Sequence, residues 1–378
     1  MKILFTGGST GGHFYPILAV AEEVNRIADE RNLIKPDLYY IAPDPYDERL
    51  LAENDITYFS APAGKIRRYP SIKNFFDLFK TAIGIVRAIF LMFSIFPDVV
   101  FSKGSYSSFP TVFAARVFGI PVIIHDSDAS PGRANLWASK FAYRIAVSHP
   151  QAIDYFDKKV HDRIALTGNP IRKGIAHPAE QGAHEFLGFS KEIPTLLILG
   201  GSQGAKIIND AIIDALPEMI ERYQIVHQTG SDNEAEVRGM ATISLEENPY
   251  KNRYKAFGYL NDLAMRMSAG AADLVISRAG SAIFEIASWQ KPAIIVPINE
   301  QVSHDQRKNA YAYARTGAAI VIEEHNLTPH VLLSEINRIM DTPGLKDSMI
   351  AATQDLSHPD AATKIAMEIL SIGVKHEE

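Results

Sequence analysis

Two glycine-rich segments of this chain have the composition and the position to bind an anion. GGSTGG occupies residues 7–12 and directly follows the apolar run MKILFT, while GGSQGA occupies residues 200–205 and directly follows TLLIL. Glycines between a strand and a helix let the backbone approach a ligand, and the helix N-terminus offers N–H groups and a positive dipole end. Either segment alone is compatible with a plain tight turn, but their recurrence favours phosphate binding.

The residues after the first segment exclude the standard nucleotide motifs. A P-loop needs a lysine and then a serine or threonine after its last glycine, whereas His13 and Phe14 follow Gly12. Neither segment has the G-x-G-x-x-G spacing of a dinucleotide fingerprint, so NAD and FAD are disfavoured. His13 instead supplies a side chain that can take up a proton near neutral pH, and we interpret it as a general base rather than a structural histidine.

Short apolar runs in a regular rhythm predict the elements that position these residues. In the first half, LYYIA, DVVF, PVIIH and RIAVS alternate with helix-length segments, which is typical of a parallel sheet wrapped by helices. In the second half, LLILGG, QIVHQTG, YKAFGYL, DLVISRAG and AIIVPIN repeat this plan. The segment from Pro16 predicts a helix, with the proline in its first turn. Ligands of such sheets bind at the carboxyl ends of the strands, so two sheets facing each other would form one cleft.

The length and a break in the rhythm predict two domains. A chain of 378 residues exceeds one ordinary core, and the segment from Gly168 to Pro194 is rich in proline, glycine and polar residues. We place the first domain at residues 1–168 and the second at residues 169–357. A helix is expected within residues 358–378 and could pack back on the first domain.

The composition excludes several classes of function. Hydrophobic residues make up 47% and charged residues 22%, as in folded soluble proteins. Because the chain contains no cysteine, it has no disulfide, thiolate metal site or cysteine nucleophile. The formal net charge of -6 argues against nucleic acid as the main partner. The N-terminus lacks the pattern of a secretion signal, so we expect a protein that stays inside the cell.

Residues 65–98 combine basic and aromatic residues in one predicted helix. Lys73, Lys80 and Arg87 recur every seven residues and share a face. The apolar residues of another face are Phe75, Phe79, Ala82, Val86, Ile89 and Phe93. Charged residues interrupt the apolar runs, so no membrane-spanning helix is expected. The spacing favours a core helix with a cationic side in water over a helix lying on an anionic membrane surface.

Taken together, the motifs resemble those of the MurG family. TGGSTGGHFYP, HDSDASPGRAN, GNPIR, LGGSQGA, HQTG, SRAG followed by FEIA, and HDQRKNAYA occur in the family's order over nearly the whole chain. The resemblance implies an α/β protein of the GT-B glycosyltransferase fold, with two Rossmann-like parallel-sheet domains facing a central cleft. It also implies an inverting transfer of N-acetylglucosamine from UDP-N-acetylglucosamine to the 4-hydroxyl of the muramyl sugar of lipid I. The acceptor is a polyprenyl-diphosphate-linked muramyl peptide, and the product is lipid II of peptidoglycan and cell wall biosynthesis.

The family resemblance also bears on metals, cofactors and membranes. HDSD, residues 125–128, contains the D-x-D pattern that holds a metal in other glycosyltransferases, but that motif belongs to a single-sheet architecture. We therefore expect no obligatory metal, and we expect no cofactor. The family works as a peripheral protein at the cytoplasmic face of the cell membrane. This gives the helix around Lys73 to Arg87 a reason to bind an anionic membrane surface.

The resemblance assigns the donor to the second half. It implies that Ser202, Gln203 and Arg172 meet the UDP diphosphate. Leu260 would offer backbone groups to uracil, and Glu285 would accept hydrogen bonds from the ribose. The donor sugar would be surrounded by Arg278, Gly280, Gln306 and Asn309. Outside this family pattern, Glu285, Gln306 and Asn309 would be interpreted as helix-surface or capping residues.

The resemblance assigns the acceptor to the first half. His13 would deprotonate the acceptor hydroxyl, with Tyr106 and Asp128 as further catalytic candidates. Asn135 would line the acceptor, and the backbone of Thr10, Gly11 and Gly12 would receive the diphosphate of the lipid.

The chain departs from the family pattern at three places. Ser105 stands where the family usually has glycine, and Asp128 stands where many members have asparagine. The Asp128 carboxylate adds a negative charge beside a site for an anionic lipid. The segment from Arg278 to Glu285 is one residue shorter than expected. Two other functions remain open: a UDP-N-acetylglucosamine 2-epimerase-like isomerase, and a non-catalytic UDP-sugar-binding paralogue.

Overall fold

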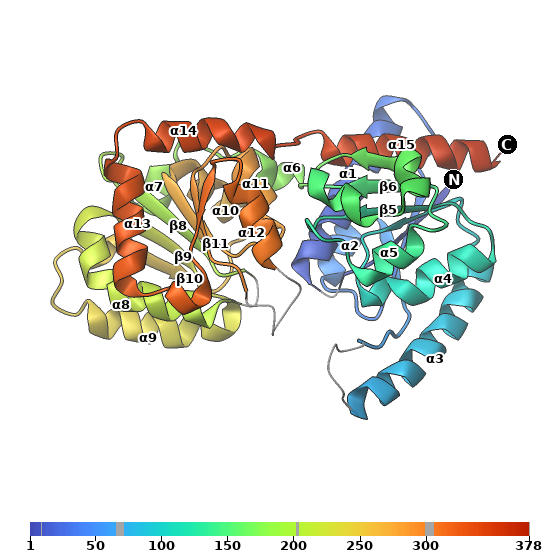
Figure 1. The fold of residues 1–378 in the computed structure, drawn as a ribbon, viewed down its shortest axis with the longest axis horizontal. Coiled ribbons are helices and arrows are strands. Elements are labelled where there is room, and N and C mark those ends of the chain that lie inside the picture. Colours follow the sequence, from blue (N-terminus) through green and yellow to red (C-terminus); the bar gives the residue numbers. More distant parts are fainter. Residues whose placement is uncertain (9, 66–71, 202–203, 299–305, 378) are drawn as a thin grey trace. The chain divides into compact units, whose positions relative to one another are not determined.

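The chain folds into two compact units, Met1–Arg172 together with His358–Glu378, and Lys173–Ser357 (Figure 1). The computed structural model describes residues 1–8, 10–65, 72–201, 204–298 and 306–377, without the side chains of residues 72, 73 and 375–377. The expected domain boundary after residue 168 lies slightly before the division after Arg172. The segment 358–378 belongs to the first unit.

The first unit is built on a parallel sheet that has seven strands in the described residues, in the order β3-β2-β1-β4-β5-β6-β7. The strands are β1 Lys2–Thr6, β2 Asp37–Ala42, β3 Ile56–Ser60, β4 Val99–Ser102, β5 Val122–Asp126, β6 Arg144–Val147 and β7 Ile164–Leu166. The sequence rhythm did not reveal β3 and β7. Both are edge strands with partly exposed side chains, so their apolar pattern is weaker.

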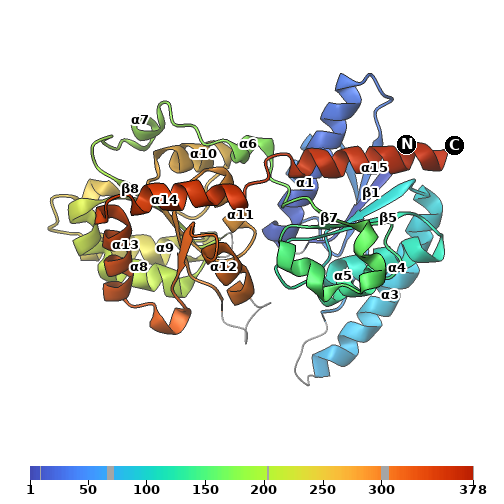
Figure 2. The ribbon, with the colours of Figure 1, turned by 45° about the horizontal axis from the view of Figure 1, so that its top comes forward.

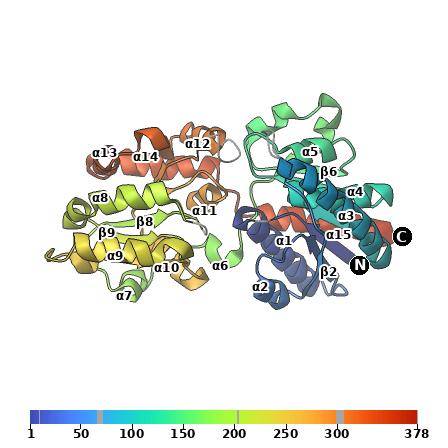
Figure 3. The same cartoon turned by 90° about the horizontal axis from the view of Figure 1, so that it is seen from below.

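Helices cover both faces of this sheet. They are α1 Gly11–Glu30, α2 Glu48–Glu53, α3 Ile72–Ile95, α4 Phe109–Val117, α5 Arg133–Ala138 and α15 Ala361–Glu377. Strand side chains alternate, so Ile3 and Phe5 pack with α1 and α15, whereas Leu4 packs with α3 and α4. Figure 2 shows α15 beside α1, and Figure 3 shows α3 beside α4. Helix α15 therefore completes the core of the first unit.

The start of α1 differs from the sequence prediction. The helix begins at Gly11, so Gly11, Gly12 and His13 form its first turn and Pro16 lies inside it. The proline was expected in the first turn because its missing N–H is harmless there. The end of the glycine segment thus belongs to the helix N-terminus.

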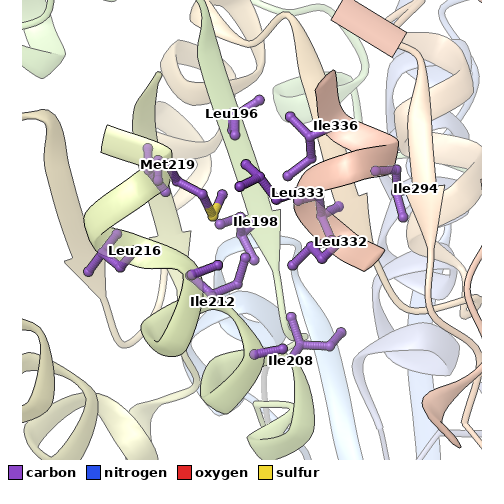
Figure 4. Packing of buried hydrophobic residues seen from close by; sticks show 14 of the residues in the cluster. Leu196, Ile198, Ile208, Ile212, Leu216, Met219, Ile294, Leu332, Leu333 and Ile336 are labelled. Carbon is purple, nitrogen blue, oxygen red and sulfur yellow. The ribbon is translucent and has the colours of Figure 1, made fainter. Parts of the chain in front are cut away.

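The second unit repeats the plan with a parallel sheet of six strands in the described residues, ordered β10-β9-β8-β11-β12-β13. The strands are β8 Thr195–Leu199, β9 Gln224–Gln228, β10 Tyr254–Phe257, β11 Leu274–Ser277, β12 Ala293–Ile295 and β13 Ala319–Val321. The helices are α6 Lys173–Ala176, α7 Ala183–Leu187, α8 Lys206–Arg222, α9 Glu234–Ser244, α10 Asp262–Ala271, α11 Ala282–Ser288, α12 Gln306–Ala314, α13 Pro329–Asp341 and α14 Leu345–Ala352. Figure 4 shows Leu196 and Ile198 of β8 packed against α8 and α13.

In each sheet the strand order reverses beside the first strand of the unit. The reversal lies between β1 and β4 in the first unit and between β8 and β11 in the second. Ligands of open α/β sheets bind at such a point, beyond the carboxyl ends of the strands. The two glycine segments follow β1 and β8, so each starts at this point of its own sheet.

Helix α3 corrects one sequence prediction and bears on another. Its core face consists of Ala88, Met92 and Ile95, whereas the predicted apolar stripe is exposed, with Phe75 61% and Phe93 71% accessible. The interpretation as a core helix with this stripe inside is therefore wrong. In the described part of the chain, the stretch Asn74–Ile95 is also long and apolar enough to cross a membrane by length and composition, with a mean hydropathy of 1.9. Length and composition alone do not establish a span, so the expectation of a helix that does not cross the membrane stays a prediction.

Candidate active site

The first glycine segment requires glycine for steric reasons. Gly7 and Gly8 have φ values of 124° and 86°, which disfavour any other residue. A Cβ on Gly7 would lie 3.0 Å from the Cβ of Lys103. The buried Tyr40 hydroxyl donates a hydrogen bond to the carbonyl of Gly7. The segment is thus held tightly between β1, β2 and the end of β4.

The N-terminus of α1 presents Thr10, Gly11, Gly12 and His13. Thr10 is the N-cap residue, but its side chain forms no capping hydrogen bond to the helix backbone. Its hydroxyl instead lies 3.0 Å from Nδ1 of His13. When Nδ1–H donates to this hydroxyl, Nε2 is the nitrogen that can accept a proton. His13 was expected in a loop; it lies in the first helical turn, where Thr10 fixes its orientation.

The carboxyl end of β5 is organised by Asp126. Its Oδ1 accepts a hydrogen bond from the Asp128 N–H at 2.9 Å, and its Oδ2 accepts from the Gly132 N–H at 3.0 Å and from Asn135 Nδ2 at 2.8 Å. Asn135 Nδ2 also donates to the carbonyl of His125. Asp128 is half-buried, while Asn135 is buried with its amide turned toward β5. These hydrogen bonds show that Asn135 stabilises the conformation of this loop.

Tyr106 lies after β4, at the start of the 3-10 helix Tyr106–Ser108. It is half-buried. The preceding Ser105 has a φ of 75° and a ψ of 164°, a conformation that glycine adopts much more easily. The serine at this departure from the family pattern therefore carries backbone strain.

The same edge of the sheet holds two buried titratable residues that were not among the predicted site residues. Lys103 and His125 are 2% and 0% exposed. Burial lowers the pKa of Lys103 to about 8, against the attraction of Asp126 and Asp128. Burial and the charge of Asp128 raise the pKa of Asp126 to about 6. Lys103 directly follows β4, and its place at a strand's carboxyl end was the signal that could have identified it.

Arg172 lies in the first unit, although the donor assignment had placed it in the second domain. It is 6% exposed, and its guanidinium lies 4.4 Å from the ring centroid of Tyr15 in α1. Such stacking fixes the planar cation near the first turns of α1. Its assignment to the donor diphosphate remains a prediction.

The second glycine segment lies at the start of α8. Ser202 and Gln203 are outside the described residues, so their predicted contacts remain predictions. Gly204 has a φ of 75° that favours glycine, and α8 begins at Lys206. Leu260, the predicted uracil contact, is 2% exposed, and its N–H donates to Oε1 of Gln228 at 3.0 Å. Gln228 thus holds the backbone of this loop in place.

Five of the predicted donor residues lie at or after the carboxyl end of β11, on the turn that follows this strand and on α11 and α12. Arg278 Nη1 donates to the carbonyl of Val296 at 3.1 Å and lies 2.7 Å from Glu324 Oε1. Burial lowers the pKa of Arg278, and the charge of Glu324 opposes this shift. A Cβ on Gly280 would approach Gln306 Nε2 to 3.8 Å.

The other members of this group come from α11 and α12. Asn309 is buried, and its Nδ2 donates to the carbonyl of Ala279 at 3.2 Å. This bond ties α12 to the turn after β11. Glu285 is half-buried on α11. Glu324, which pairs with Arg278, was missed because nothing in the local pattern of its 3-10 turn indicates a partner 46 positions earlier in the chain.

Both units match the domains of one glycosyltransferase family. Residues 3–147 match the glycosyltransferase family 28 N-terminal domain, and residues 195–365 match its C-terminal domain. The first family domain contains β1, α1 and the ends of β4 and β5, while the second contains the second glycine segment and the group after β11. The family division therefore follows the two candidate sites.

Curated relatives match along most of the chain. A relative from Clostridium kluyveri is 37% identical over 89% of this chain and 91% of its own length, and one from Bacillus thuringiensis subsp. konkukian is 35% identical over 97% and 94%. Both are named UDP-N-acetylglucosamine–N-acetylmuramyl-(pentapeptide) pyrophosphoryl-undecaprenol N-acetylglucosamine transferases.

Solved structures agree on the fold. The crystal structure of Acinetobacter baumannii MurG matches with a TM-score of 0.72 and 25% identity, covering 98% of this chain and 99% of that one. A UDP-GlcNAc 2-epimerase from Neisseria meningitidis matches with a TM-score of 0.68 at 15% identity over 98% and 100%, which shows a shared fold only. The two parallel-sheet units thus have the GT-B type of fold, and the chain belongs to the MurG family of glycosyltransferases within family 28.

Proposed function

We propose that this chain transfers N-acetylglucosamine from UDP-N-acetylglucosamine to the 4-hydroxyl of the muramyl sugar of lipid I, which yields lipid II. The observation that carries this proposal is the 37% identity to a named transferase over 89% of the chain. The epimerase likeness is limited to the fold at 15% identity. The reaction belongs to peptidoglycan synthesis.

His13 is the proposed general base. Its Nε2 takes the proton of the acceptor hydroxyl while the hydroxyl oxygen attacks the anomeric carbon of the donor sugar. The bond from that carbon to the diphosphate breaks on the opposite face, so the configuration inverts and UDP leaves. The 3.0 Å contact between Thr10 and Nδ1 supports this role because it orients the ring.

The diphosphate that leaves gains negative charge, which fixed donors and cations can stabilise. We assign this role to Ser202, Gln203 and Arg172. Glu285 binds the ribose diol, and the Leu260 backbone binds uracil. Arg278, Gly280, Gln306 and Asn309 shape the pocket of the donor sugar; the ion pair with Glu324 and the bond to Ala279 support this by fixing Arg278 and Asn309.

On the acceptor side, the N-terminus of α1 binds the lipid diphosphate through backbone N–H groups of Thr10, Gly11 and Gly12. Tyr106 and Asp128 face the acceptor sugar, and Asn135 keeps the Asp128 loop in position. The hydrogen bonds of Asp126 to both Asp128 and Asn135 support this division of roles.

Product analysis with UDP-N-acetylglucosamine and a short-chain lipid I analogue tests the reaction. We expect UDP release only when the acceptor is present, together with a β-1,4-linked disaccharide product. Epimerisation of the donor sugar without acceptor would instead establish the isomerase alternative. UDP binding without turnover by either route would establish a non-catalytic paralogue.

We also assign α3 to peripheral binding at the cytoplasmic face of the membrane. Its exposed face carries Phe90 and Phe93, each 71% accessible, and the exposed cations Lys80 and Arg87. A groove of about 680 Å³ runs along this face and is lined by Ala82, Ile83, Val86, Arg87, Phe90, Leu91 and Ser94. Aromatic residues inserted beside cations suit an anionic bilayer surface.

Vesicle co-sedimentation of the full chain tests this assignment. The double variant Lys80→Glu/Arg87→Glu should lower partition into anionic vesicles by at least about thirtyfold, because each lost basic residue alone costs roughly 1 kcal/mol. The matched control reverses the exposed Lys158 and Lys159 of the same unit. The substitutions Phe90→Ser and Phe93→Ser should reduce binding to the vesicles at high salt as well as at low salt. Equal binding of both charge variants would contradict a role for α3.

A further inference from the structure

Lys103 has an environment that is unusual for a lysine. Its side chain is 2% exposed, and among the residues that the structure describes its Nζ has no hydrogen-bond partner. The charges of Asp126 and Asp128 attract the ammonium, but neither carboxylate accepts a hydrogen bond from it. A buried charge without a hydrogen bond destabilises a fold. The packing of the first unit therefore gives no reason for a lysine here.

The position of Lys103 in the sheet explains why a buried lysine occurs here. Its N–H donates to the carbonyl of Thr6 at 2.9 Å, so it lies where the strand order reverses between β1 and β4. Its Cβ lies against Gly7, the first residue of the glycine segment. Lys103 therefore directly follows β4 beside the start of the glycine segment that leads into α1. The glycine segment that Lys103 contacts continues into the N-terminus of α1, where the N-cap side chain forms no capping hydrogen bond.

We propose that Lys103 is an anion-binding residue of the acceptor site and that its ammonium meets the diphosphate of the lipid-linked acceptor. This inference rests on the proposed function. The incoming diphosphate oxygens supply the hydrogen bonds that the ammonium lacks, in addition to those from the α1 backbone. Lys103 also offsets the carboxylate of Asp128, the residue whose negative charge is unfavourable for an anionic acceptor.

Replacement by a neutral residue of similar length tests the proposal. In Lys103→Met, the KM for a lipid I analogue should rise by about tenfold to a hundredfold, the range for a hydrogen bond to a charged group. The KM for UDP-N-acetylglucosamine should stay within about twofold of wild type, because substitutions at sites without shared partners act independently. Lys291→Met is the matched control, since Lys291 is a half-buried lysine of the second unit whose pKa is also lowered by burial.

A second arm identifies the anion. Inorganic diphosphate should inhibit wild type in competition with the acceptor, and this inhibition should be lost in Lys103→Met. With an acceptor analogue that lacks the peptide, the KM of Lys103→Met should exceed that of wild type by the same factor as with the complete acceptor. If the two proteins have equal KM values for this analogue, Lys103 binds a peptide carboxylate and the proposal is overturned.

Measurement of the stability of Lys103→Met distinguishes a role of Lys103 in binding from a role in holding the fold. The Lys103→Met protein should unfold at the same denaturant concentration as wild type or at a higher one. An unchanged acceptor KM in an active, folded variant overturns the proposal. A loss of stability with both KM values altered overturns it as well. Absence of transfer by wild type would instead contradict the proposed function itself.

Discussion

Lys103→Met should stabilise the first unit at neutral pH. Burial lowers the pKa of the ammonium from 10.5 to about 8, a gap that corresponds to about 3 kcal/mol of folding free energy. Removal of the ammonium also removes an attraction that lowers the pKa of Asp126, so part of the gain is lost. We expect a net increase of about 1–3 kcal/mol in the free energy of unfolding at pH 7.

The difference in the free energy of unfolding between Lys103→Met and wild type should depend on pH in a defined way. Between pH 8 and 10.5 the unfolded wild type binds more protons at Lys103 than the folded state does, so wild-type stability rises with pH. Methionine does not titrate. The advantage of the variant should therefore be full below pH 8 and should disappear as the pH approaches 10.5.

Urea unfolding monitored by tryptophan fluorescence measures this difference in the full chain. The chain has two tryptophans, Trp137 in the first unit and Trp289 in the second. A Trp289→Phe background makes the signal report the first unit, which avoids treating a two-unit chain as one transition. A variant less stable than wild type at pH 7, or a difference independent of pH, would refute the reasoning.

Three further substitutions test other parts of the structure. His13→Ala should lower kcat by roughly 10²–10⁴-fold with the fold intact, as measured by steady-state kinetics and circular dichroism; a loss below about tenfold contradicts a general base. Ser105→Gly should raise the free energy of unfolding by about 1 kcal/mol because it relieves a φ of 75°, and no gain in urea unfolding would argue against strain. Glu324→Gln should raise the donor KM by about fivefold, or roughly 1 kcal/mol, with the acceptor KM unchanged, because Arg278 loses its 2.7 Å ion pair.

Local patterns predicted the central strands well and the edges poorly. LYYIA, PVIIH and TLLIL became β2, β5 and β8 because buried parallel strands are continuously apolar. The edge strands β3 and β7 lack such runs, whereas the edge strand β13 lies in the short apolar run 318–322 and was not among the predicted strands. The start of α1 was misplaced because Pro16 suggested a first turn, whereas the glycines before it adopt helical geometry.

The site residues show the same limit. Motif order in the sequence was enough to identify the family, which the relatives confirmed. The selection of His13 remains a prediction. Motif order could not show that the Asn135 amide turns inward to Asp126 and His125. It also could not show that the apolar stripe of α3 stays exposed, because periodicity reports which residues share a face and not what covers that face.

The sequence by itself determined two parallel-sheet halves, each with a glycine segment at a strand end, because these depend on local apolar runs and on glycine's backbone freedom. Tertiary structure alone decided which charges are buried together. Lys103 directly follows β4, Asp126 ends the neighbouring strand β5, and burial at this edge lowers the pKa of Lys103 and raises that of Asp126. Desolvation depends on what surrounds a side chain in space, and no local pattern encodes it.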